Sequence, residues 1–182
     1  LEYITPQSLL GLTATPERAD GLDIKHYFDD HVTAEIRLPD AIDRKLLSPF
    51  QYFGITDSVD YSQVKWQRGG YVTSELTNIY TGDDRRANMI LDKTIGIVLD
   101  IRKAKGLGFC VSKAHAEFMA CKFNSHGVPA EFLTSDSDKV SRKTVQKRLL
   151  SGEINFIFVV DLYNEGVDIP EIDTVLSNLL LK

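Results

Sequence analysis

The segment INFIFVV, residues 154 to 160, places the narrowest limits on the fold of this chain. A short apolar run that is rich in β-branched and aromatic side chains indicates a strand rather than a helix. Because successive residues point to opposite faces of a sheet, a run without alternation is typical of a strand buried on both faces, as in a parallel sheet. The segment therefore predicts an α/β domain whose helices cover both faces of the sheet.

The rest of the chain after residue 83 alternates in the way that a parallel sheet requires. Apolar residues recur with helical period from Ala87 to Ile101. Ser112 is a predicted N-cap for a helix over 113–126, which Gly127 ends. Ser135 and Asp136 are candidate caps for a further helix around residues 145–149. Three more strands are predicted, at 108–111, 130–133 and 173–178. We expect a three-layer αβα domain with a mostly parallel sheet.

The first 82 residues show a different pattern of predicted elements. An apolar run, Leu9–Leu12, is predicted to be a strand that ends at Thr13 and Thr15. From 23 to 82, short strand-like runs at 35–38 and 51–55 and a short helix over 40–47 alternate with loops. We therefore divide the chain into a terminal strand (1–22), a connector (23–82) and an α/β domain (83–182).

Composition excludes several classes of protein. Hydrophobic residues make up 43% of the chain and charged residues 26%, as in folded globular proteins. A net charge of −5 leaves no general basic field, so any contact with nucleic acid must be local. Two cysteines are too few for a disulfide framework and favour a reducing compartment. No apolar run approaches the ~20 residues that span a bilayer, so we predict no membrane partner and a cytoplasmic location.

The carboxyl ends of parallel strands are where such sheets bind ligands. The segment that leaves the 154–160 strand carries two suitable residues: Gly166, which can let a phosphate or ribose approach the backbone, and Asp168, which can accept hydrogen bonds from a sugar. Considered alone, the same segment is equally consistent with a polar turn.

Two motifs make the chain resemble the superfamily 2 helicases. Thr13-Ala14-Thr15 is similar to their motif III, and residues 159–170, with NEGVDIP, look like motif V in its type III restriction enzyme-like form. GFCVS, residues 108–112, occupies the place of motif IV. TSDSDKVSR, residues 134–142, occupies the slot of an element that follows the nucleic-acid backbone.

The resemblance implies a motor of two RecA-like lobes with ATP and Mg²⁺ between them in the full-length protein. Residues 1–22 would be the last strand of the first lobe, and 83–182 the second lobe, truncated before motif VI. Thr13 and Thr15 would couple the two ligands, and Gly166 and Asp168 would contact ATP. The residues implied to contact nucleic acid are Ser112, Lys113, Thr134, Ser135, Asn164 and Glu165.

Departures from the family pattern are equally informative. The sequence has no G-x-x-x-x-G-K-[S/T] phosphate loop and no Asp-Glu pair before motif III. The arginine-bearing motif VI would follow Lys182. Val160 stands where many helicases have threonine, which puts a hydroxyl contact there in doubt. We therefore predict no catalytic and no metal-binding residue in this segment, no tight nucleotide binding, and no ATP hydrolysis by it alone.

Weaker candidates have simpler explanations. Five basic residues on one predicted helix (Lys139, Arg142, Lys143, Lys147, Arg148) are more often a solvated face than a phosphate site. The four histidines lack partners at recognisable spacing and are predicted to be structural or exposed. Trp66, with Tyr61 and Tyr71, could stack on bases, but aromatic residues in a connector more often pack against the neighbouring domain.

These observations favour the second motor lobe of an ATP-dependent DNA helicase or translocase. DNA is favoured over RNA only because this branch mostly acts on DNA, and the missing first lobe is the implied partner. Fused domains and the oligomeric state stay open. Two alternatives remain: a nucleotide- or protein-binding α/β module without motor activity, and a plain nucleotide-binding enzyme domain.

Overall fold

The computed structural model describes residues 7–13, 24–56, 60–62, 64–67, 70–160, 162 and 169–177. The chain divides into two compact units, Leu1–Ile55 and Thr56–Lys182. No helix among the described residues is long and apolar enough to cross a membrane.

The first unit contains little regular structure. It has a 3₁₀ helix, η1 (Ile24–Phe28), and a short helix, α1 (Leu38–Asp43). The helix α1 overlaps the predicted 40–47 helix but begins two residues earlier, after the N-cap residue Arg37, and ends at Asp43. The strands predicted at Leu9–Leu12, 35–38 and 51–55 are wrong, because these segments form no ladder. A strand requires a neighbour for its N–H and C=O groups, and the described residues of this unit supply none. Leu10 and Leu12 are accordingly exposed.

The second unit contains the sheet. Its elements are β1 (Trp66–Gln67), β2 (Gly70–Tyr71), α2 (Thr73–Thr81), α3 (Asp84–Ile97), β3 (Gly106–Phe109), α4 (Lys113–Ser125), β4 (Ala130–Leu133), α5 (Lys139–Ser151), β5 (Phe156–Val159) and β6 (Thr174–Ser177). β1 and β2 form a separate antiparallel hairpin.

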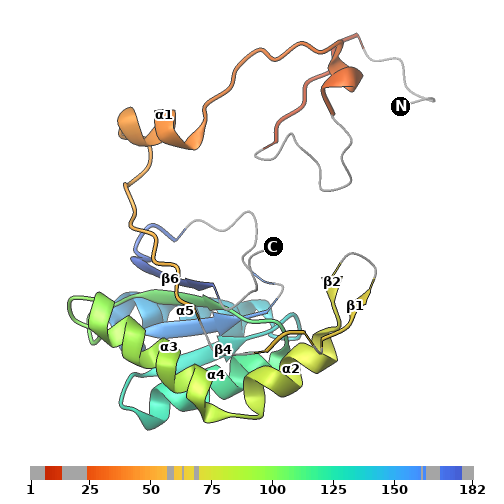
Figure 1. Ribbon diagram of the computed structural model, residues 1–182. Helices are drawn as coiled ribbons and strands as arrows, with labels where there is room; N and C mark the ends of the chain where they lie inside the picture. The colour runs from red at the N-terminus through yellow and green to blue at the C-terminus, as the bar shows by residue number, and fades with distance from the viewer. Residues whose placement is uncertain are drawn as a thin grey trace. The chain divides into compact units, whose positions relative to one another are not determined.

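The main sheet has the strand order β4-β5-β3-β6, and every pairing in it is parallel (Figure 1). Each of the strands β3, β4 and β5 is followed by a segment that leaves the same edge of the sheet. The parallel sheet with covering helices confirms the predicted α/β fold class.

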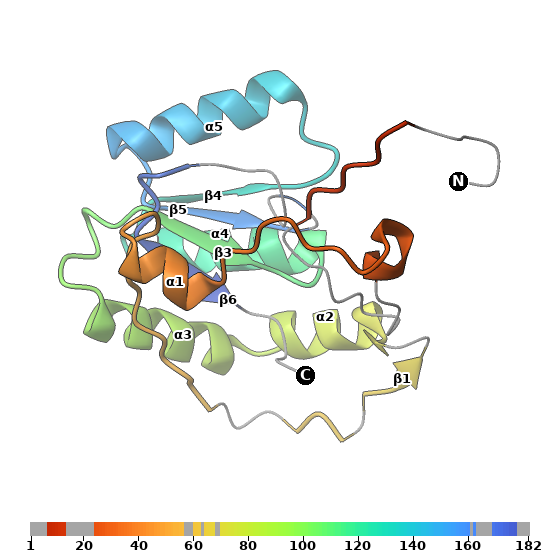
Figure 2. The ribbon, with the colours of Figure 1, turned by 90° about the horizontal axis from the view of Figure 1, so that it is seen from above.

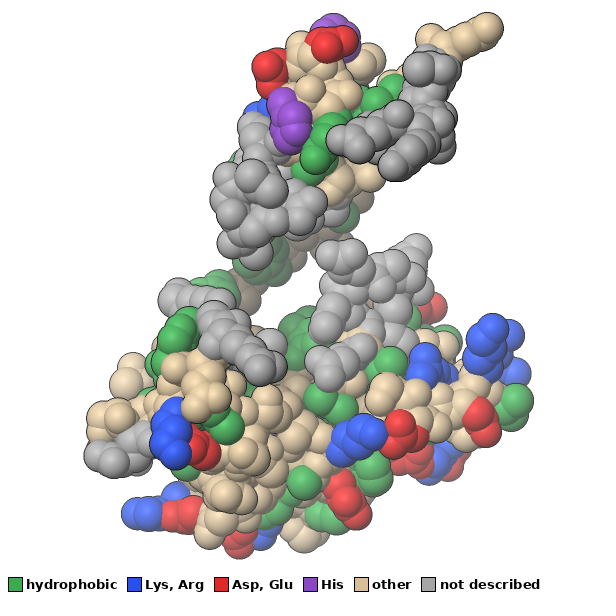
Figure 3. All heavy atoms as spheres, turned by 90° about the vertical axis from the view of Figure 1, so that its right-hand side faces the viewer, with side chains coloured by type: hydrophobic (Ala, Val, Ile, Leu, Met, Phe, Trp, Pro, Cys, Tyr) green, Lys and Arg blue, Asp and Glu red, His purple; other side chains and the backbone are tan. Residues whose placement is uncertain are grey.

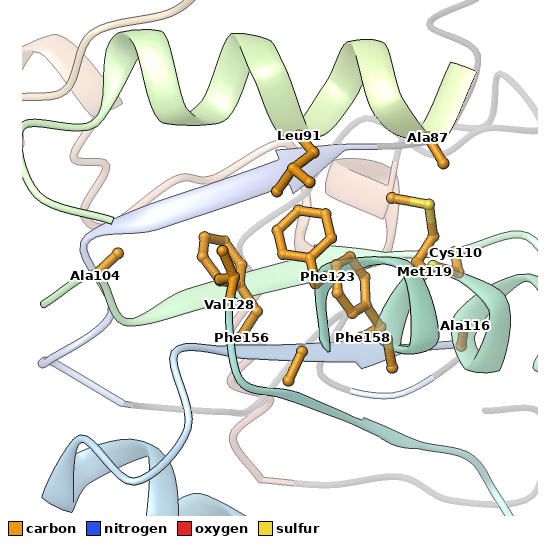
Figure 4. Close-up of a cluster of buried hydrophobic side chains, with 12 residues drawn as sticks. Ala87, Leu91, Ala104, Cys110, Ala116, Met119, Phe123, Val128, Phe156 and Phe158 are labelled. Atoms are coloured by element: carbon orange, nitrogen blue, oxygen red, sulfur yellow. The ribbon is translucent and has the colours of Figure 1, made fainter. Parts of the chain in front are cut away.

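Helices cover both faces of the main sheet (Figure 2), and an apolar core lies on each face. Phe156 and Phe158 of β5 point to one face, where they pack with Phe123 of α4 and Leu91 of α3 (Figure 4). The alternate residues of β5 belong to the core on the other face, which includes Leu149 of α5. The run is apolar at successive positions because both of its faces are covered, which gives the three predicted layers.

Helix ends follow local sequence rules, with one exception. Ser112 caps α4 by accepting the backbone N–H of His115, and Gly127, with a φ of 76°, follows that helix as predicted. α5 is capped by Asp138, whose carboxylate accepts the N–H of Ser141 at 2.7 Å, so Ser135 and Asp136 are wrong as caps. Those two residues lie in a turn that precedes the helix.

Part of the predicted connector packs with the sheet-bearing unit. Leu76 and Tyr80 of α2 form a third apolar cluster with Val64, against which Val111 packs. The compact unit therefore begins at Thr56, well before residue 83. The assignment of residues 1–22 to a first lobe stays a prediction.

Candidate nucleic-acid interface

The register of the sheet brings three strand ends together. Val159 of β5 is aligned with Phe109 of β3 on one side and with Leu133 of β4 on the other. The segments that follow these strands therefore leave the sheet side by side at its carboxyl edge. They are GFCVS with Lys113, the loop from Thr134, and the segment that begins at Val160.

Ser112 is held at this edge by two partners. Its Oγ accepts the N–H of His115 at 3.2 Å and lies 2.8 Å from Oγ1 of Thr77 in α2. The first contact caps α4, and the second ties α2 to the loop after β3. The Ser112 hydroxyl is half-buried and engaged, so its position is set before any ligand arrives.

Lys113 forms an ion pair with Asp136. The two side chains are 53% and 72% exposed, so the pair lies at the surface. The Lys113 ammonium, by hydrogen bonding and by charge, holds the pKa of the Asp136 carboxyl below its usual value. The ammonium is the basic group that a phosphate would meet, but a carboxylate already accompanies it.

The loop after β4 is closed on itself. The N–H of Thr134 donates to Ser137 Oγ, and the N–H of Ser137 donates to the Thr134 carbonyl, both at 3.0 Å. Arg142 braces this turn from α5, because its guanidinium donates to the carbonyls of Ser137 at 2.8 Å and Ser135 at 3.0 Å. Thr134 is buried and Ser135 is exposed, so of these two Ser135 presents its hydroxyl to solvent.

The basic residues of α5 divide into two groups. Arg142 braces the loop, and Arg148 pairs with Glu131 and Glu153. The other three basic residues are exposed, as expected for a solvated helix face: Lys139, Lys143 and Lys147.

His115 is the one buried histidine among the described residues. Its Nδ1 accepts the N–H of Val111 at 3.4 Å, so Nε2 carries the proton of the neutral ring. Burial, aided by the charge of Arg86, lowers the pKa of His115 to about 3. The centroids of the His115 and Tyr80 rings lie 4.9 Å apart, and the His115 ring accepts a hydrogen bond from the loop after β3. These contacts give the histidine the structural role predicted for it.

Several predicted site residues lie outside the described part of the chain: Thr15, Asn164, Glu165, Gly166 and Asp168. Thr13 is exposed in the first unit. Leu162, within the predicted motif V, and Ile172, just after it, pack against the core on the α5 face. The roles assigned to these residues stay predictions.

No group of three or more His, Cys, Asp or Glu side chains within the described ranges could hold a metal ion. The described edge offers the exposed Ser135 hydroxyl and the Lys113 ammonium, with the Asp136 carboxylate beside that ammonium. The hydroxyl and the ammonium fit phosphate oxygens, whereas the residues predicted to meet ATP are in the undescribed 163–168 segment.

Sequence reasoning missed three residues that organise the edge. Thr77 contacts Ser112 from the predicted connector, and no local pattern indicates that contact. Asp136 was considered only as a cap. Arg142 was grouped with a charged face, although its place in the first turn of α5 could have suggested a bond back to the preceding loop.

The fold and this edge define an αβα lobe that presents phosphate-compatible groups at the carboxyl ends of parallel strands. Comparison with known families then identifies the lobe: the helicase conserved C-terminal domain matches residues 88–178, and the chain belongs to that family. It is the C-terminal domain of a superfamily 2 helicase, as the motifs predicted.

Relatives are similar over different lengths. IRC3 of Saccharomyces cerevisiae, named as an ATP-dependent helicase, is 25% identical over 92% of this chain and 24% of its own length. A 51.5 kDa protein of a Lactococcus phage is 25% identical over 93% of this chain and 36% of its own. UvrABC system protein B of Kosmotoga olearia is 35% identical over 41% of this chain and 11% of its own. This chain thus spans about a quarter to a third of the first two relatives.

Among solved structures, the Hef helicase domain of Pyrococcus furiosus aligns with a TM-score of 0.41 and 20% identity, over 52% of this chain and 19% of its own length.

Proposed function

We propose that this chain is the second motor lobe of an ATP-dependent DNA helicase or translocase. The observation that carries the proposal is the register of β3, β4 and β5, which brings together the carboxyl ends of the strands that lead into the motif IV, 134–142 and motif V segments. Family membership supports the same reading. The type III restriction enzyme-like branch and a cytoplasmic location belong to the proposal.

The nucleic-acid contacts follow from the chemistry of this edge. Ser135 and the backbone after Ser112 present donors to phosphate oxygens, and Lys113 exchanges the Asp136 carboxylate for a phosphate. Asn164 and Glu165 continue this track. None of these groups reads a base edge, so the contacts are independent of sequence.

The nucleotide contacts come from the next residues of the same segment. Gly166 and Asp168 face the ribose, while the absent first lobe supplies the phosphate loop and the Mg²⁺ ligands. Thr13 and Thr15 couple the two ligands. Because one segment contacts both ligands, closure of the cleft on ATP shifts the nucleic-acid strand.

The test joins this chain to a first lobe that carries a phosphate loop and measures ATP turnover with and without single-stranded DNA. Turnover stimulated by DNA supports the motor, and the 182-residue chain alone should show none. Substituting single-stranded RNA of the same length tests the preference for DNA. DNA binding without any stimulated turnover would favour a binding module.

A further inference from the structure

The β1–β2 hairpin carries an exposed tryptophan. Trp66 is aligned with Tyr71 across the hairpin and is 51% exposed. The two rings meet edge to face, with centroids 4.8 Å apart and an angle of 87° between their planes. The hairpin projects from the beginning of α2 (Figure 1).

The base of the hairpin is anchored to α2. The N–H of Lys65 donates to Glu75 Oε2 at 2.7 Å, and the N–H of Val72 donates to the Lys65 carbonyl at 3.0 Å. The Lys65 ammonium lies 3.5 Å from Glu75 and remains 70% exposed. Tyr71, the neighbour of Trp66, packs at the margin of the third apolar cluster. Trp66 therefore lies on a hairpin whose base is attached to α2 by hydrogen bonds.

The same support leads to the carboxyl edge of the sheet. Val111, directly before Ser112, packs against the cluster that also contacts Tyr71. Further along α2, Thr77 Oγ1 lies 2.8 Å from Ser112 Oγ. The hairpin and the candidate phosphate contacts are thus joined through one helix and one cluster.

The surroundings of Trp66 fit a polynucleotide. Exposed Lys65 directly precedes Trp66, and Arg68 is two positions after Trp66 in the sequence. Figure 3, which looks onto this side, shows apolar side chains of the sheet-bearing unit scattered among basic and acidic ones. Proteins that bind single strands combine basic groups along the backbone with aromatic rings on which bases stack.

Resting on the proposed function, we propose that Trp66 stacks on a base of the single strand whose phosphates contact the Ser112 and Thr134 loops. The stacking site adds base contact to an edge that otherwise meets only the backbone. Stacking is tolerant of sequence because every base offers a π face.

The chain contains a single tryptophan, so its emission reports on this residue alone. We would titrate the chain with fluorescein-labelled oligodeoxythymidine and follow tryptophan emission and label anisotropy together. Quenching of the emission with the same midpoint as the anisotropy change is expected. Trp66→Ala should weaken binding roughly fivefold to a hundredfold, and Trp66→Phe should retain most of the affinity.

Two controls separate stacking from other effects. An abasic oligonucleotide keeps the phosphates, so Trp66→Ala should not change its affinity. Ile95→Ala removes an exposed apolar side chain near the C-terminal end of α3. That end of α3 lies far from α2 (Figure 1), so the substitution should leave binding unchanged. Circular dichroism checks that each variant is folded.

The outcomes distinguish the stacking proposal from the proposed function. Oligonucleotide binding that leaves the emission unchanged and survives Trp66→Ala overturns the stacking and keeps the nucleic-acid edge. An equal loss of affinity for intact and abasic strands also overturns it, because a base contact cannot cause that loss. No binding to either strand would overturn the nucleic-acid role of the lobe and the stacking with it.

Discussion

The Lys113 ammonium and the Asp136 carboxylate form an ion pair that joins the start of α4 to the loop after β4. The pair lies where three strand ends meet, between two segments that the family resemblance assigns to the nucleic-acid track. The proposed function implies that a phosphate would compete with Asp136 for Lys113.

Replacing Asp136 by asparagine should therefore strengthen binding of single-stranded DNA. Removing a negative charge a few ångströms from a phosphate in water should raise the affinity roughly fivefold. Fluorescence anisotropy at several salt concentrations measures both the affinity and its salt dependence. Asp84→Asn removes the same charge from an ion pair with Lys122 near the other end of α4, and serves as the control. Equal gains in both variants would contradict a specific role for Asp136.

The contact between Thr77 and Ser112 should be measurable as a coupling energy. Thr77→Val keeps the side-chain shape but removes the hydroxyl, and Ser112→Ala removes the partner. We expect a coupling of about 0.5–1.5 kcal/mol in a double-mutant cycle of urea unfolding. Additive effects of the two substitutions would show that the hydroxyls do not support one another.

Glycines 106 and 108 of β3 lie under the phenylalanine rings of β5. A Cβ added at Gly108 would come within 2.4 Å of the Phe158 ring, so Gly108→Ala must displace the ring. We expect a loss of about 1–3 kcal/mol in the free energy of unfolding. At Gly96, in α3, an added Cβ meets nothing within 4 Å. There, the same substitution should stabilise by up to about 1 kcal/mol. If Gly108→Ala and Gly96→Ala change the free energy of unfolding in the same direction, this packing argument is wrong.

Buried His115 should make stability depend on pH. The unfolded ring binds a proton near pH 6.5, whereas the folded ring does so only at about 3. Between these values the unfolded state holds the extra proton. The free energy of unfolding therefore falls as the pH falls, by about 1.4 kcal/mol per pH unit for this group.

His115→Asn offers a non-titrating acceptor near Val111 and should remove this contribution. The difference between wild type and variant isolates it from Asp83, Asp136 and Asp138, whose lowered pKa values make stability fall with acid as well. Denaturant unfolding from pH 7 to 4 measures it. Parallel curves for the two proteins would mean that His115 is protonated or accessible in the folded state.

Asp168→Ala tests the nucleotide contact of the proposed motor. In a protein that joins this lobe to a first lobe, the loss of a hydrogen bond from the ribose should weaken ATP binding by about 1–3 kcal/mol. Titration with a fluorescent nucleotide measures the affinity. An unchanged affinity would remove Asp168 from the nucleotide site.

The sequence by itself determined the strands of the sheet, their parallel direction and the caps of α4. The strand β4 has the predicted bounds and β5 lies within the predicted run, whereas β3 begins and ends two residues before the predicted 108–111 strand. Such features depend on a few neighbouring residues, because side-chain alternation, helical period and capping are local. The parallel direction also implied that the strand ends would lie together, which placed the candidate site at one edge.

Only the tertiary structure decided which groups at that edge are already engaged. The strand order, the bond between Thr77 and Ser112, and the burial of His115 join residues distant in sequence or depend on what packs around them. The pairing of Lys113 with Asp136 is likewise a contact between two loops. The run Leu9–Leu12 was overpredicted as a strand for a related reason: a strand exists only where another strand satisfies its backbone.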